Sequence, residues 1–169
     1  SIIKTERQLI GSLFYIKAHP EIIIGELILS IRPEWFTDIR NKNIISTLKI
    51  MIDRGDVIMP DVAVQFSQIK NAYGLSEDEI NQDLKKMMIE WARLLKRQRN
   101  QEKNIIEGLI NVLRDRFMMS QLNDLSKRLP NIVKDNKTNK EKLSIIQNVI
   151  GDISENFSIP MSKPDGMDL

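Results

Sequence analysis

Residues 6–61 read ERQLIGSLFYIKAHPEIIIGELILSIRPEWFTDIRNKNIISTLKIMIDRGDVIMPD. Apolar side chains recur here every three to four residues, the spacing that places them on one face of a helix. Thr5 and Gln8 have the form of a capping box, prolines stand where helices begin, and Gly55 supplies the left-handed conformation that ends one. The stretch therefore predicts several short helices. Their apolar sets are Leu9, Ile10, Leu13 and Phe14, and Ile44, Ile45, Leu48, Met51 and Ile52.

Helical spacing continues through the rest of the chain. Asp61 is a plausible cap for one helix, and Ser76 with Glu79 forms a second capping-box pattern. The proline-free stretch 102–129 and the stretch 143–157 predict two long helices, with the polar residues 130–140 as the loop between them. Only residues 57–59 have strand-like character, and three residues cannot build a sheet. The predicted fold is all-α, a small helical bundle followed by a long antiparallel helical hairpin.

This pattern divides the chain into three parts. Residues 1–100 are predicted to form a globular helical head, 101–157 a hairpin used for oligomerisation, and 158–169 a linker. The hairpin helices carry apolar stripes that an isolated monomer would leave partly exposed, which favours self-association. We expect Ile146→Asp to weaken this association unless the stripe is used up within the hairpin. The predicted self-association residues are Ile106, Ile110, Leu113, Phe117, Leu143, Ile146, Ile150 and Ile153.

Composition excludes several classes of chemistry. The 169 residues contain no cysteine, so disulfides, thiol nucleophiles and cysteine-ligated metals are ruled out. His19 is the one histidine, so a histidine-based metal site or catalytic triad would depend on it alone. No phosphate-binding loop occurs, and the acidic run at 77–79 fits the first turn of a helix better than a catalytic cluster. We therefore assign no catalytic, cofactor-binding or metal-binding residue. With no apolar run near 20 residues and no signal peptide, we expect a cytoplasmic protein that does not bind membranes.

The net charge of +2 is unevenly distributed. Residues 93–103 contain five basic residues against one acidic residue, whereas the charges of 104–169 cancel and those of 1–92 are slightly negative. Such a segment could contact phosphate groups of DNA, although it lacks interleaved aromatics for base stacking. A solvated helix end or a contact with an acidic partner is the favoured interpretation. The residues concerned are Arg93, Lys96, Arg97, Arg99 and Lys103.

Trp35 and Phe36 allow two interpretations. Aromatic side chains dominate the energetic centres of protein interfaces, so the pair could anchor a partner. Alternatively, the two rings fill a corner of a small core, and this is the interpretation we favour.

Several segments, taken in order, carry a family resemblance. They are ERQLIGSLF at 6–14, RPEWF at 32–36, IRNKNIISTLKIMIDRG at 39–55 and PDVAV at 60–64. Together they resemble the N-terminal domain of replicative hexameric helicases of the DnaB type. The stretches 104–129 and 140–157 resemble the two helices of that family's hairpin, and YGLSEDEINQDL at 73–84 is similar to phage-encoded members. The matching positions are Glu6, Leu9–Gly11, Pro33, Glu34, Phe36, Arg40, Gly55 and Asp61.

The resemblance implies a function without catalysis. Domains of this family pair through their hairpins, form a collar above a hexameric motor ring and dock primase or a helicase loader. ATP and Mg²⁺ belong to the motor domain, so the resemblance implies no cofactor here. The tail FSIPMSKPDGMDL at 157–169 is similar to the stretch that enters the motor. The helicase-binding C-terminal domain of bacterial primases shares this plan and remains an alternative, and the residues His19, Pro20 and Glu21 fit that family too. A small DNA-binding module that uses residues 93–103 is another alternative.

Overall fold

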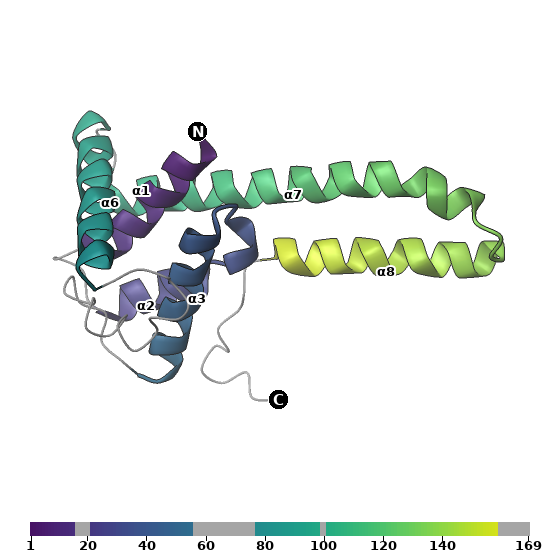
Figure 1. The fold of residues 1–169 in the computed structure, drawn as a ribbon, viewed down its shortest axis with the longest axis horizontal. Coiled ribbons are helices and arrows are strands. Elements are labelled where there is room, and N and C mark those ends of the chain that lie inside the picture. Colours follow the sequence, from purple (N-terminus) through teal and green to yellow (C-terminus); the bar gives the residue numbers. More distant parts are fainter. Residues whose placement is uncertain (16–20, 56–76, 99–100, 159–169) are drawn as a thin grey trace.

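A computed structural model describes residues 1–15, 21–55, 77–98 and 101–158 of the chain. Within these ranges the molecule contains helices and no strand, so the predicted all-α class is confirmed. Figure 1 shows a head of short helices from which two long helices project side by side. The elements are α1 (Ile2–Tyr15), α2 (Glu21–Leu29), the 3₁₀ turn η1 (Pro33–Trp35), α3 (Ile39–Asp53), α6 (Glu77–Arg97), α7 (Glu102–Lys134) and α8 (Asn139–Phe157).

Helix α1 lies at the centre of the head. Every residue from 8 to 14 is buried, because α1 packs against α6 most extensively and also against α7 and α3. The core therefore includes both faces of the helix rather than a single stripe. Its largest fully buried side chains are Trp35, Trp91, Phe14, Leu9, Ile10, Leu13, Ile28, Ile31, Ile44, Ile45 and Leu48.

Gly11 permits the close packing of α1 on α6. A Cβ atom built at this position would lie 2.1 Å from the backbone carbonyl oxygen of Met87. Because the obstructing atom belongs to the backbone of α6, any larger residue would have to push the two helices apart. The glycine therefore sets the distance between α1 and α6.

The first helix begins earlier than the sequence predicted. Thr5 lies inside α1, and its backbone N–H donates to the carbonyl oxygen of Ser1 at 3.2 Å. The backbone N–H of Lys4 also donates to Ser1 Oγ at 3.4 Å. Ser1 therefore caps the helix and the predicted capping box of Thr5 with Gln8 is wrong; Gln8 is buried against the core instead.

Hydrogen bonds of Glu6 join α1 to the turn that precedes α3. Its carboxylate is fully buried and accepts hydrogen bonds from Thr37 N at 3.0 Å, Thr37 Oγ1 at 2.6 Å and Asp38 N at 3.2 Å. Asp38 in turn caps α3 by accepting from Asn41 N at 3.2 Å. The helix that Pro33 was expected to begin is only one 3₁₀ turn. Gly55 has φ of 77°, as its predicted role at the end of α3 requires.

The long helix α7 continues through Pro130, so the predicted loop at 130–140 begins too early. The proline is exposed, so the carbonyl group it leaves unbonded one turn earlier faces solvent. Figure 1 shows α7 bending towards α8 over its last turns, as proline-containing helices do. The loop is therefore residues 135–138 rather than 130–140, and Thr138 caps α8 by accepting from Glu141 N at 3.2 Å.

Some predictions concern residues outside the described ranges. These are His19, Pro20, the capping residues Asp61 and Ser76, Arg99 and the linker 159–169. None of the described helices is both long enough and apolar enough to cross a membrane.

Candidate assembly surface

The two helices that leave the head form an arm with no buried core of its own. We define the arm as residues 114–157, and α7 extends about 30 Å along it. No side chain from Arg114 to Asp152 is buried, and Ile153 at 7% exposure is the first buried residue of α8. A pair of helices can cover only the stripe that each presents to the other. The apolar residues outside those stripes therefore face solvent.

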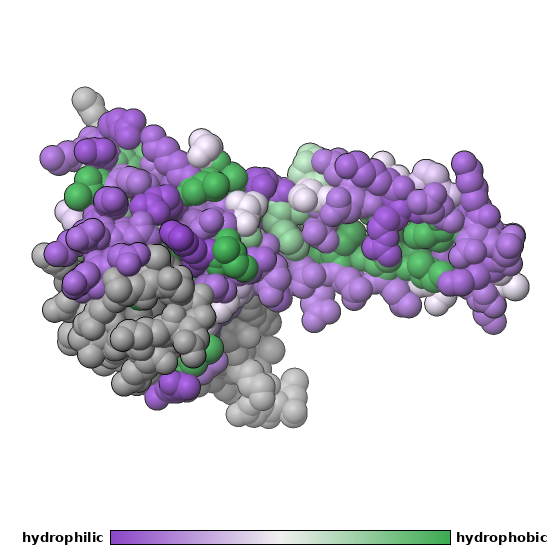
Figure 2. All heavy atoms as spheres, in the orientation of Figure 1, coloured by the Kyte–Doolittle hydropathy of each residue, from purple (hydrophilic) through white to green (hydrophobic). Residues whose placement is uncertain are grey.

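These solvent-facing residues gather on one side of the arm, which we call the apolar face. Within α7 their spacing keeps them in an arc of about 60°, and the same holds for α8. In each helix this arc is turned from the half-buried stripe in the same rotational sense along the chain. Because the helices run antiparallel, the two arcs therefore lie on the same side of the plane that contains both helix axes. Figure 2 shows apolar side chains following the arm between hydrophilic ones. The apolar face consists of Met119 (60% exposed), Leu122 (47%), Val133 (59%), Leu143 (56%) and Ile150 (48%).

The opposite side of the arm has a different character. It carries a shallow groove with a volume of about 480 Å³ between α7 and α8. Apolar side chains form its floor, whereas acidic and basic side chains stand at its rim. The lining residues are Gln121, Asp124, Leu125, Lys127, Arg128, Val149, Asp152 and Ile153. The groove's mixed charges distinguish it from the apolar face.

About the first third of α7, residues 102–113, belongs to the head rather than to the arm. Ile106, Ile110 and Leu113 are buried in the head core, and α7 there packs against α1. Three of the predicted self-association residues therefore lie inside the molecule and offer no surface. Phe117 and Ile146 are half-buried, Ile153 is buried, and Leu143 with Ile150 remains exposed. The head consequently extends past residue 100 to about 113, beyond the predicted domain boundary.

Two side chains of the head and Arg114 at the start of the arm contact the end of α8, and we call these the base contacts. Trp35 Nε1 donates to the carbonyl oxygen of Asn156 at 2.8 Å, and Arg32 Nε donates to that of Ser158 at 2.6 Å. The Arg114 guanidinium lies 5.0 Å from the ring centroid of Phe157, within cation–π range. Trp35 itself is 1% exposed, so Trp35 and Phe36 belong to the core, as we favoured.

Charge is polarised along the arm. The tip, residues 127–142, contains six basic and two acidic residues. Lys142 Nζ donates to the carbonyl oxygen of Val133 at 2.6 Å and thereby helps to end α7. Nearer the head the balance reverses, with acidic residues outnumbering basic ones. These acids are Asp115, Asp124, Asp152 and Glu155.

The basic segment expected from sequence is divided between two helices. Arg93, Lys96 and Arg97 are exposed near the end of α6, while Lys103 is exposed in the first turn of α7. Sequence reasoning missed Lys85 and Lys86, which lie on the same face of α6. The helical spacing of positions 85, 93 and 96, which places them on one face, was the available signal. Summing the net charge over residues 1–92 concealed it, because the acidic residues of α6 cancelled the charges of the two lysines.

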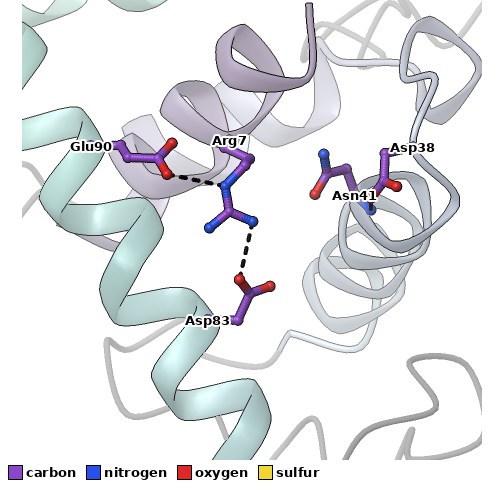
Figure 3. Close-up of polar contacts among 5 residues, drawn as sticks. All are labelled: Arg7, Asp38, Asn41, Asp83 and Glu90. Atoms are coloured by element: carbon purple, nitrogen blue, oxygen red, sulfur yellow. Dashed lines mark hydrogen bonds and ion pairs between the residues drawn. The ribbon is translucent and has the colours of Figure 1, made fainter.

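Two of the acids of α6, Asp83 and Glu90, face α1 and pair with Arg7. Figure 3 shows Arg7 between Asp83 and Glu90, with its guanidinium 3.0 Å from Asp83 Oδ1 and 3.2 Å from Glu90 Oε1. Burial acts to lower the pKa of Arg7, but the two carboxylates outweigh this and raise it above its ordinary value. The ion pairs therefore join α1 to α6 beside Gly11.

Lys49 on α3 is the second titratable group with a displaced pKa. Burial lowers its pKa first, and the positive charge of Arg32 lowers it further, against opposing effects of Glu34 and Asp53. This cluster connects α3 to one of the base contacts. Among the described residues, no three histidine or acidic side chains gather closely enough to hold a metal ion.

Comparisons with protein-family models, curated proteins and solved structures return no match to this chain.

Proposed function

We propose that this chain is a non-catalytic assembly module that pairs with a second copy of itself through the apolar face of its arm. The observation that carries the proposal is the absence of any buried side chain from Arg114 to Asp152. Five large apolar residues on one side of such an arm would gain free energy from burial, at about 25 cal/mol per Å² of apolar area removed from water. A second arm supplies a matching surface by symmetry.

The charge pattern supports an antiparallel pairing of the two arms. In that arrangement the basic tip of one arm lies beside the acidic part of the other, whereas parallel arms would place the two basic tips together. Like charges brought together disfavour an interface, and complementary ones fix its orientation. The two heads would then lie at opposite ends of a four-helix bundle formed by two arms.

We further propose that the module is the N-terminal collar domain of a DnaB-type replicative helicase, where pairs of subunits assemble into a hexameric ring and dock primase or a loader. The ordered sequence resemblance is the support for this step. The structure adds a physical reason for two of the resembling positions, since Glu6 holds the turn before α3 and Gly11 admits α6. ATP and Mg²⁺ would act in the motor domain of the parent protein.

Sedimentation velocity at protein concentrations between about 5 and 500 μM tests the pairing. This range covers the dissociation constants of weak to moderate dimers. We expect a dimer in the wild type and a monomer for Ile150→Asp, which places a charge on the apolar face. Asn148→Asp adds the same charge on the groove side and should leave the dimer intact. Ile150 is a sharper test than Ile146, because half-buried Ile146 also contributes to the hairpin itself. A wild type that stays monomeric throughout would refute the pairing.

The helicase assignment has a separate test. It predicts that a phosphate-binding motif G-x-x-x-x-G-K-[ST] follows this chain in the same reading frame. It also predicts binding of the cognate primase in isothermal titration calorimetry. A primase catalytic domain encoded upstream would instead support the primase alternative. If neither domain is encoded and no primase binds, the collar assignment is wrong even where the chain dimerises.

A further inference from the structure

Helix α6 presents a cationic face to solvent. All five of its basic residues are exposed. At 100° per residue their positions fall within an arc of about 120°, and they extend over about 18 Å of the helix. The buried side of α6 carries Ile80, Leu84, Met87 and Trp91 and faces α1. The cationic face consists of Lys85, Lys86, Arg93, Lys96 and Arg97.

The acidic residues of α6 do not neutralise this face. Asp83 and Glu90 project towards α1 and pair with Arg7, as Figure 3 shows. The remaining acids lie in the first turn, before Lys85, where they complement the helix dipole. In the described part of the chain, the ion pairs of α6 involve none of its five cations. Positive charge is therefore concentrated over residues 85–97 of α6.

The chemistry of the face fits phosphate groups better than a protein partner. Lysine is depleted at protein interfaces and aromatic residues are enriched there, and this face has three lysines and no aromatic residue. Its two arginines are a residue type found at protein interfaces but also one suited to binding phosphate. Ile89, the one apolar residue within the same arc of α6, is 51% exposed. The cations stand at residues 85–86, 93 and 96–97, with about 10 Å of helix between the first and second groups. A flexible single strand can adapt its phosphates to such uneven spacing. Such contacts position a backbone without reading its sequence.

We infer that the cationic face of α6 binds the phosphate backbone of single-stranded nucleic acid without sequence preference. The arm and its apolar face take no part in this binding. The inference therefore stands apart from self-association, and each can fail without the other.

Fluorescence anisotropy with a labelled oligothymidylate of about 20 nucleotides tests the inference, using the full chain at 50 mM salt, where phosphate contacts are strong. We expect Lys85→Glu/Arg93→Glu to weaken binding at least tenfold and to reduce the slope of log K against log salt by about 1.4, because each lost phosphate contact removes about 0.7. All the substituted residues are exposed, so circular dichroism should show an unchanged fold.

Lys127→Glu/Arg128→Glu is the matched control, because it changes the net charge equally but lies on the arm. It should retain binding within about twofold, and a mixed-sequence oligonucleotide should bind as tightly as oligothymidylate. Absence of binding at 50 mM salt, or equal losses in both double variants, would overturn the inference. Tighter binding to polyglutamate of equal charge would overturn it too and assign the face to an acidic protein.

Discussion

Glu6 illustrates what a single residue contributes to this fold. A buried carboxylate is expensive unless its oxygens are hydrogen-bonded, and this one receives three donors from the turn at residues 37–38. The sequence offered Glu6 only as part of a family resemblance. Its partners lie thirty residues away, and helical periodicity carries no information about such distant hydrogen bonds.

Glu6→Gln should destabilise the protein by about 2 kcal/mol, because hydrogen bonds to a charged carboxylate are replaced by weaker ones to a neutral amide. Urea unfolding would show a lower midpoint with an unchanged slope. Glu34→Gln is a control at an exposed position and should shift stability by about 0.5 kcal/mol or less. Equal midpoints for the two variants would contradict the role of Glu6.

Gly11→Ala should destabilise the protein although alanine favours helices by about 1 kcal/mol over glycine. The added methyl group would overlap the Met87 carbonyl oxygen, and separating α1 from α6 should cost about 2 kcal/mol or more in net stability. Gly108→Ala is the matched control in α7, where nothing lies within 4 Å of the new Cβ, and it should stabilise. Thermal unfolding of both variants would show Tm changes of opposite sign.

At the scale of elements, the sequence predicted the helices better than their boundaries or partners. The spacing predicted the hairpin, but it placed the end of α7 before Pro130, whereas the helix continues through this exposed proline to Lys134. Ile106, Ile110 and Leu113 have the same period as residues further along α7. Periodicity identifies the face of a helix but not whether another segment of the same chain covers it.

Trp35→Phe tests the base contacts at this scale. The change removes the donor to the Asn156 carbonyl oxygen, so amide hydrogen exchange at residues 154–158 should accelerate about fivefold, which corresponds to about 1 kcal/mol. Trp91→Phe is the control, because Trp91 is equally buried and its Nε1 has no hydrogen-bond partner among the described residues. It should lower global stability without selective exchange at the end of α8. Matching exchange patterns would argue against a specific contact.

For the whole molecule, the sequence anticipated an apolar arm but not which of its residues remain on the surface. Leu143 and Ile150 were included, whereas Met119, Leu122 and Val133 were found only once the register of α7 against α8 was fixed. The cationic face of α6 was hidden for a similar reason. Arg7 binds the acids that had balanced Lys85 and Lys86 in the sequence count, and that pairing depends on the packing of α1.

Pairing through the arm also predicts that thermal stability depends on concentration. Because only the folded chain dimerises, raising the concentration from 10 μM to 1 mM should raise Tm by about 3–5 °C. Differential scanning calorimetry would measure this rise, and Ile150→Asp should abolish it. A wild-type Tm that does not change over this range would contradict a folded dimer.

The base contacts have a geometric consequence, because they set the direction in which the arm leaves the head. An arm about 30 Å long amplifies any rotation at its attachment to the head. A tilt of about 10° displaces the tip by about 5 Å, roughly the pitch of one helical turn. Arg32, Trp35 and Arg114 therefore determine where a partner's head would be carried. Substitutions at these three positions would change the dimensions of any assembly while leaving its contact surfaces intact.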